Sequence, residues 1–168
     1  MGAKVGQNSL LIFCSTGPDF VCRRFQEINI SPNSIAAEQQ QKLLALARSA
    51  LQNAYAPYSH FRVGAAVLTS RGGLYSGCNV ENASYGLTVC AERSAIFTAV
   101  AAEGKGMQIQ AVAVCTDGDG SCAPCGACRQ VIFEFGPQAT IFFQGKYGVE
   151  QASISSLLPH GFRLDTDS

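Results

Sequence analysis

Three cysteines and one glutamate of this 168-residue chain stand at spacings that suit a catalytic metal site. Cys125 and Cys128 lie three residues apart after Pro124, and Cys90 is followed two residues later by Glu92. Zinc prefers tetrahedral sulfur and nitrogen ligands, and a catalytic zinc keeps one position open for water. Glu92 need not bind the metal and can instead move protons between the water and a substrate. We therefore predict that the three cysteines bind Zn²⁺ and that Glu92 is the acid–base residue.

The charge of such a site needs an offset. Three thiolates around one divalent ion leave a net charge of about −1, which weakens the metal as a Lewis acid. Arg93 and Arg129 each follow a ligand segment closely, and a guanidinium can donate hydrogen bonds to sulfur. We predict that Arg93 donates to a ligand thiolate, while Arg129 could pair either with sulfur or with a carboxylate.

Non-catalytic interpretations of these residues stay open at this point. A Pro-Cys-x-x-Cys segment alone also suits a structural zinc or a redox pair. Cys122 lies three residues before Cys125 and could replace Cys90 in a structural zinc knot. His60 and His160 are isolated from the cysteines, so neither is a favoured ligand.

The hydrophobic pattern predicts the elements that must position these residues. Cys90 and Cys125 fall at the starts of two predicted helices, where the positive end of the helix dipole favours thiolate over thiol. The alternation of elements predicts an α/β fold, a mixed sheet of about five strands with helices on both faces. The predicted helices are 35–53, capped by Ser34, 89–102, 125–136 and a short turn over 154–158; the predicted strands are 61–69, 74–78, 109–115, 139–143 and 146–150.

Composition limits the class of protein. Hydrophobic residues make up 47% of the chain and charged residues 14%, and the formal net charge is zero. These values are typical of one globular domain and argue against a nucleic-acid partner, which usually meets a basic surface. We expect a poorly structured N-terminal extension over 1–33, a catalytic domain over 34–168, and no membrane segment. With 8 cysteines and no convincing export signal, a reducing, cytoplasmic location is expected, and the low charge hints at oligomerisation.

Five separated motifs resemble the cytidine deaminase family, in particular its small homotetrameric branch with three cysteine ligands. The match covers about residues 38 to 162 and keeps the order of the family's motifs. Zinc deaminases combine a histidine or cysteine ligand, a nearby non-ligand glutamate and a later Pro-Cys-x-x-Cys. The matching segments are Tyr58-Ser59-His60-Phe61, Val63-Gly64-Ala65-Ala66, Gly77 to Ala83, Cys90-Ala91-Glu92-Arg93, and Pro124 to Gln130.

The resemblance implies a three-layer αβα sandwich and hydrolysis of free cytidine and deoxycytidine to uridine and deoxyuridine, in pyrimidine salvage. A zinc-bound hydroxide would attack C4 of the base, and Glu92 would carry protons through ring N3. Two positions match residues that hold the ribose hydroxyls, Asn79 and Glu81. Other matched positions would contact the base: Phe61 on the ring, the Ala91 N–H on the carbonyl, and Phe162 as an aromatic lent by a neighbouring subunit of a homotetramer.

The chain departs from some relatives at three positions without touching a ligand or the acid–base residue. Arg62 and Gly86 stand where some relatives have proline, and Ala123 stands where serine is common. These departures leave the preference between substrates open. Two other functions remain as alternatives, deamination of a base within RNA or DNA and a non-catalytic zinc-stabilised binding module.

Overall fold

One mixed five-stranded sheet organises the computed structural model, which describes residues 35–118 and 120–164. The predicted extension over 1–33 lies outside the described residues. The strands lie in the order β2-β1-β3-β4-β5, and only β3 and β4 run parallel to each other. Their bounds are Val63–Thr69 for β1, Leu74–Cys78 for β2, Ile109–Thr116 for β3, Thr140–Gly145 for β4 and Gly148–Ser153 for β5.

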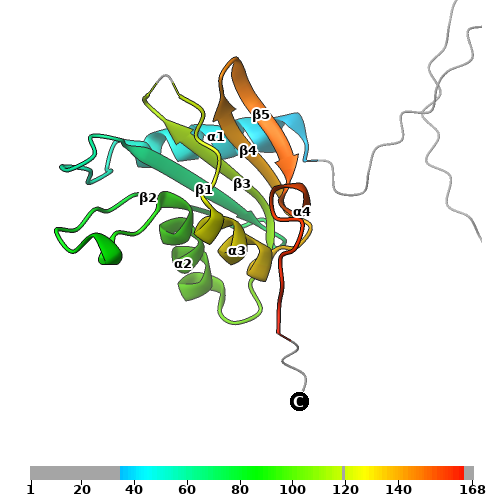
Figure 1. The fold of residues 1–168 in the computed structure, drawn as a ribbon. Helices are drawn as coiled ribbons and strands as arrows, with labels where there is room; N and C mark the ends of the chain where they lie inside the picture. The colour runs from blue at the N-terminus through cyan, green and yellow to red at the C-terminus, as the bar shows by residue number, and fades with distance from the viewer. Residues whose placement is uncertain (1–34, 119, 165–168) are drawn as a thin grey trace, which may run out of the picture.

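Helix α1, Ala37–Leu51, covers one face of this sheet (Figure 1). Its buried residues are the ones that helical spacing predicts: Leu43, Leu44, Ala47, Ala50 and Leu51. Gly64 of β1 allows the close approach, since a Cβ there would lie 2.1 Å from the Ala47 carbonyl oxygen. The predicted cap was wrong, because the helix begins later and its N-cap is Ala36, which makes no side-chain capping bond.

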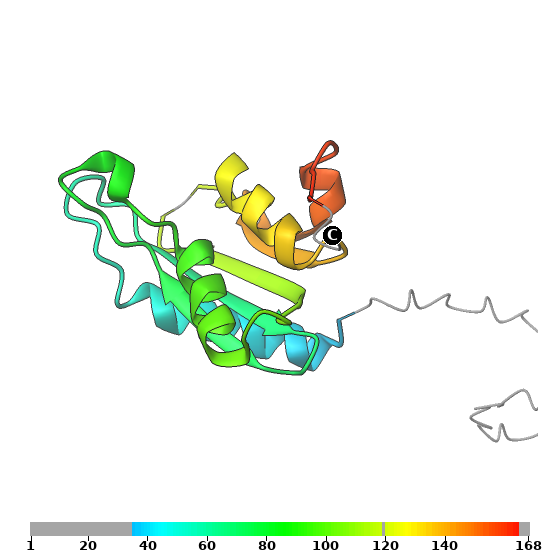
Figure 2. The ribbon, with the colours of Figure 1, turned by 90° about the horizontal axis from the view of Figure 1, so that it is seen from below.

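The opposite face carries α2, Ala91–Glu103, α3, Gly126–Phe135, and the short α4, Ile154–Leu157. The view from below separates the layers, with α3 and α4 on one side of the strands and α1 on the other (Figure 2). Alternate residues of each central strand point to opposite faces, so Ala65 and Val67 join the core under α2 while Ala66 and Leu68 pack under α1. The structure is therefore the expected three-layer αβα sandwich.

Most element bounds differ from the sequence prediction by one to three residues, and two of these differences have clear local reasons. The fifth strand is 148–153 rather than 146–150, because Lys146 and Tyr147 form the turn that Gly148 completes with a φ of 138°. The first strand begins at Val63, because the two residues before it belong to a loop. None of the helices in the two described ranges combines the length and apolar character that crossing a bilayer requires.

Candidate functional site

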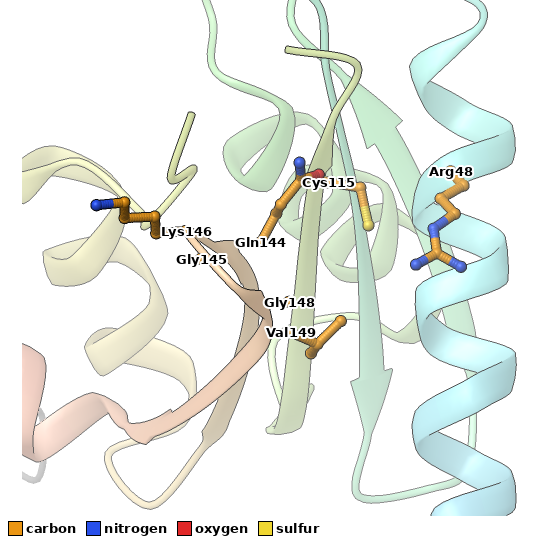
Figure 3. Close-up of a pocket in the computed structure, with 7 residues that line it drawn as sticks. All are labelled: Arg48, Cys115, Gln144, Gly145, Lys146, Gly148 and Val149. Carbon is orange, nitrogen blue, oxygen red and sulfur yellow. The ribbon is translucent and has the colours of Figure 1, made fainter. Parts of the chain in front are cut away.

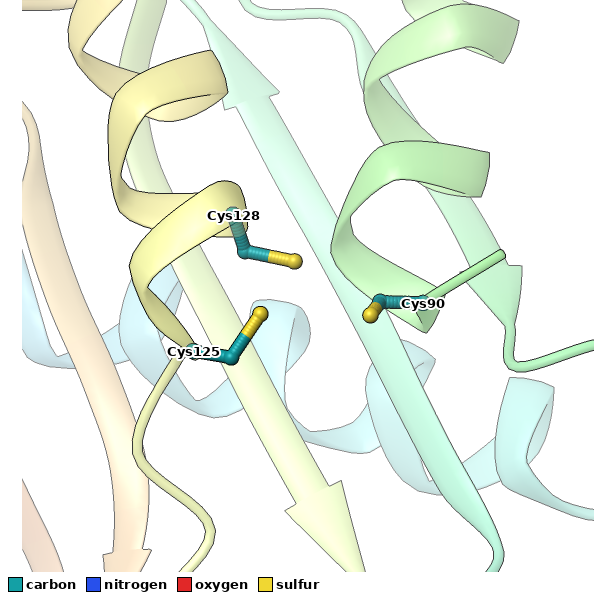
Figure 4. A group of neighbouring side chains, drawn as sticks. All are labelled: Cys90, Cys125 and Cys128. Carbon is teal, nitrogen blue, oxygen red and sulfur yellow. The ribbon is translucent and has the colours of Figure 1, made fainter. Parts of the chain in front are cut away.

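The three cysteines singled out in the sequence meet between the starts of two helices. Cys90 is the N-cap of α2, Cys125 is the N-cap of α3, and Cys128 lies in the first turn of α3. Their sulfur atoms lie within 4.8 Å of one another (Figure 4). A Zn–S bond of about 2.3 Å places two tetrahedral ligand sulfurs about 3.8 Å apart. The cluster therefore fits a zinc ion with small side-chain adjustments.

Hydrogen bonds prepare one of these thiols for a metal. The Cys128 thiol and the Arg93 guanidinium both donate to Cys90 and lower its pKa to about 5, although burial opposes the shift. The same bond, together with burial, raises the pKa of Cys128. Because zinc binds thiolate rather than thiol, the lowered pKa favours the ligating form of Cys90.

Arg93 and Arg129 have different partners. Arg93 Nη2 lies 3.4 Å from Cys90 Sγ and 3.3 Å from the Thr88 carbonyl oxygen. Arg129 donates instead to the backbone carbonyls of Pro124 at 2.7 Å and Leu157 at 2.8 Å. Arg129 thus supports the segment before the metal cluster through the backbone, and the two partners considered for it from the sequence, sulfur and a carboxylate, are not the ones it takes.

Glu92 is a buried carboxyl that faces a cavity. It lies in the first turn of α2 and is only 4% exposed. Burial raises its pKa, and the negative charge of Cys90 acts in the same direction. A buried carboxyl with a raised pKa beside a cavity is suited to accept a proton and return it.

This cavity, of about 290 Å³, collects most of the residues that the sequence proposed for substrate. Its walls come from the loop before β1, the end of β2, the start of α2 and the loop before α3. The lining includes four predicted contacts, Phe61, Asn79, Glu81 and Ala91, together with Glu92, Cys90 and Cys125. Segments separated by more than 60 residues in the chain therefore share one cavity.

Asn79 and Glu81 also hold the backbone that carries Phe61. Asn79 Oδ1 accepts from the Val63 N–H at 2.9 Å, and its Nδ2 donates to the Phe61 carbonyl oxygen at 2.9 Å. Glu81 accepts from the Tyr58 N–H at 2.8 Å. Its pKa is lowered, chiefly by a hydrogen bond from the Ser59 hydroxyl. Sequence reasoning missed this role, because the partners lie 16 to 23 residues away.

Phe162 lies outside the cavity of its own chain. Its side chain is 67% exposed, and its carbonyl oxygen accepts from Gln130 Nε2 at 2.8 Å. The fold therefore presents this ring outward from the end of the described chain, separate from the other predicted contacts.

Cys122 is a cavity residue that the sequence did not assign. Its side chain lines the cavity and is only 8% exposed, and burial raises its pKa to about 12. It stands outside the group of three sulfurs. The structural knot in which Cys122 replaces Cys90 is therefore wrong. Ser59, Thr88 and Ala123 line the same cavity.

A larger hollow of about 390 Å³ lies on the other face of the sheet, beside α1 (Figure 3). Arg48 and Cys115 face each other across it, whereas Lys146 points away (Figure 3). Its lining residues include no carboxylate, and their single cysteine, Cys115, lies outside the group of three sulfurs. The chemistry is therefore concentrated on the α2–α3 face.

An αβα fold with a cysteine cluster at two helix N-termini and a buried glutamate beside it defines the class of zinc-dependent deaminases. The family model for the cytidine and deoxycytidylate deaminase zinc-binding region matches residues 37–144. The chain belongs to the cytidine deaminase family.

Individual relatives agree with this assignment. The cytidine deaminase of Sporosarcina psychrophila is 45% identical over 73% of this chain and 90% of the relative. A probable cytidine deaminase of Dictyostelium discoideum is 43% identical over 73% of this chain and 82% of the relative. A crystal structure of cytidine deaminase from Burkholderia pseudomallei matches with a TM-score of 0.66 and 47% identity, covering 73% of this chain and 98% of that one.

Proposed function

We propose that this protein hydrolyses free cytidine and deoxycytidine to uridine and deoxyuridine, with release of ammonia, in pyrimidine salvage. Relatives named cytidine deaminase support the substrate class. The observation that carries the proposal is the buried Glu92 carboxyl, which shares a cavity of about 290 Å³ with two of the three clustered cysteines. The volume suits a small ligand that is largely enclosed.

The proposed metal site consists of Cys90, Cys125 and Cys128, with Arg93 as a donor to sulfur. When bound there, zinc supplies a water activated for attack near neutral pH. The 3.4 Å contact from Arg93 Nη2 to Cys90 Sγ offsets part of the thiolate charge.

Glu92 moves both protons of the proposed reaction. Its carboxylate accepts a proton from the attacking water and delivers it to ring N3, which makes C4 electrophilic. After the C4–O bond forms, a second proton passes through Glu92 to the amino nitrogen, the C4–N bond breaks and ammonia leaves. One water is consumed and one carbonyl is formed, so the atoms balance.

The remaining cavity residues position the nucleoside. Phe61 presents its ring to the pyrimidine, and the Ala91 N–H donates to the base carbonyl. Asn79 and Glu81 hold the ribose hydroxyls with the donor and acceptor capacity that their backbone bonds leave free.

We further propose a homotetramer in which Phe162 of one subunit completes the site of a neighbour. The ring is 67% exposed and absent from its own cavity. Other large apolar side chains are exposed as well, among them Leu87 at 66% and Phe97 at 52%. A cytoplasmic location is consistent with this proposal, because the ligands must remain reduced thiols.

The direct test uses the zinc-loaded full chain with cytidine. Conversion to uridine is followed by the loss of absorbance and by released ammonia. Glu92→Gln is the matched control, because it keeps the size of the side chain and the three cysteines while removing the proton carrier. We expect turnover by the wild type and near-complete loss in the variant at unchanged zinc content. A zinc-loaded wild type that leaves cytidine intact would overturn the proposal.

A further inference from the structure

An ion pair joins two loops that each carry residues lining the cavity. Arg62 directly follows Phe61 in the first loop, and Asp117 opens the loop that leads from β3 to the cavity residue Cys122. Arg62 Nε lies 2.7 Å from Asp117 Oδ2, and Arg62 Nη2 contacts the same oxygen. Two guanidinium donors on one carboxylate fix the orientation of the Arg62 side chain relative to Asp117.

Backbone contacts run beside the ion pair. The Thr116 hydroxyl donates to the Arg62 carbonyl oxygen at 2.9 Å and accepts from the Gly118 N–H at 3.2 Å. Gly118 in turn lies behind the aromatic ring, since a Cβ built there would be 3.6 Å from Phe61 Cε2. The second loop therefore lies against the Phe61 ring, while Asn79 holds the Phe61 carbonyl oxygen.

The segment before Phe61 needs such support. His60 has a φ of 57°, which places a side-chain-bearing residue in the left-handed region. A conformation of this kind persists where surrounding contacts hold it. Phe61 is itself 42% exposed, so core packing alone does not fix its orientation.

The geometry points to Arg62 and Asp117 as a latch that positions Phe61 for contact with the pyrimidine ring. This inference rests on the proposed function and deepens it, because it assigns substrate positioning to Arg62 and Asp117. Neither side chain lines the cavity, so both are positioning residues. Their side chains are 42% and 38% exposed, and pairs exposed to this degree contribute little to global stability. The expected effect is therefore on binding.

Steady-state kinetics with cytidine separate positioning from general damage. We expect Arg62→Ala and Asp117→Ala each to raise KM about fivefold with kcat nearly unchanged. Loss of a partly exposed ion pair should weaken binding of the substrate and of the transition state equally, and such a loss changes KM rather than kcat. The reversed pair, Arg62→Asp with Asp117→Arg, should recover most of the loss, and Arg62→Lys should be intermediate. Salt at about 0.5 M should raise the KM of the wild type toward that of the single variants, because it screens the exposed ion pair.

Arg71→Ala is the matched control, because Arg71 follows the other end of β1 and its Nε lies 4.0 Å from the Glu103 carboxylate. It should leave KM unchanged. Unaltered KM in both Arg62→Ala and Asp117→Ala, or a reversed pair no better than the single changes, would overturn the latch.

A second measurement separates this inference from the proposed function. Uridine affinity, measured by calorimetry on the same variants, does not require turnover. If the wild type fails to deaminate cytidine, the proposed function falls, while weaker uridine binding in the single variants still supports the latch. Equal uridine affinity in the wild type and the single variants would remove the latch even where deamination is normal.

Discussion

The charge of the cysteine cluster makes Arg93 important at the scale of single residues. Its Nη2 is 3.4 Å from Cys90 Sγ, while its Nε is buried without a hydrogen-bond partner among the described residues. A buried donor without a partner is costly. The guanidinium is therefore held in place for its charge and its bond to sulfur rather than for full hydrogen bonding.

We predict that Arg93→Gln lowers kcat/KM for cytidine by about tenfold or more while leaving about one zinc per chain, since a residue behind a ligand commonly tunes activity by this factor. Glutamine keeps much of the length but removes the positive charge that offsets the thiolates. Zinc content by mass spectrometry and initial rates should be measured on the same preparation. Arg71→Gln is the control, and normal turnover of Arg93→Gln would show that the charge is offset elsewhere.

Asn79 combines two tasks that can be separated by experiment. We predict that Asn79→Ala lowers the free energy of unfolding by about 1–3 kcal/mol, because it leaves the buried Val63 N–H without its acceptor. Asn79→Asp keeps that acceptor but loses the donor to Phe61, so it should retain more stability than Asn79→Ala while still raising KM. Urea unfolding and cytidine kinetics measure the two effects. Equal stability of Asn79→Ala and the wild type would contradict the backbone role.

The chemical roles of single side chains could be predicted from the sequence more readily than their contacts. Motif spacing indicated Cys90, Cys125, Cys128 and Glu92, and the structure brings their segments together. The latch was not predictable, because Arg62 and Asp117 are 55 residues apart and each alone has the pattern of a solvated charge. The cavity position of Cys122 was hidden for the same reason, since only the folded loop places it there.

At the scale of elements, glycine allows the site helices to approach the sheet. A Cβ on Gly77 of β2 would lie 2.4 Å from the Ala95 backbone nitrogen of α2. Helix α2 carries Cys90 at its start and Glu92 in its first turn, so its distance from β2 sets where both groups lie.

We predict that Gly77→Ala lowers the free energy of unfolding by about 3 kcal/mol through overpacking, and that any folded fraction binds zinc less tightly because α2 is displaced. Thermal unfolding with and without added zinc measures both effects. Gly86→Ala is the matched control, because a Cβ there meets nothing within 4 Å. A Gly77→Ala protein as stable as Gly86→Ala would mean that the backbone adjusts without moving the helix.

The type of each element could be predicted from the spacing of its apolar residues. The ends of the elements could not, because they depend on tertiary contacts. The buried stripe of α1 and the apolar run of β3 were predictable from the sequence, because burial on one or both faces determines the spacing of apolar residues. The shift of β5 to 148–153 depended on pairing with β4, where Gly145 faces Gly148 across the turn. The start of α1 was also misplaced, because the helix begins without a side-chain cap at Ala36.

At the scale of the whole molecule, the described chain holds an aromatic ring outward, apart from its own cavity. Phe162 is 67% exposed, and Gln130 fixes the backbone at this residue through a 2.8 Å hydrogen bond. A closed symmetric assembly can place such a ring in a neighbour's cavity, since each subunit gives and receives the same contact.

Subunit mixing tests this exchange. We expect Glu92→Gln and Phe162→Ala homo-oligomers each to be impaired. In mixed oligomers, a site can combine Glu92 from a Phe162→Ala subunit with Phe162 from a Glu92→Gln subunit. With equal, random mixing of subunits in a symmetric assembly, about a quarter of the sites carry both native residues. Activity after co-refolding should therefore exceed the sum of the separate parents. A mixture that only averages its parents, in a preparation shown by mass to contain hybrids, would place Phe162 outside the neighbouring site.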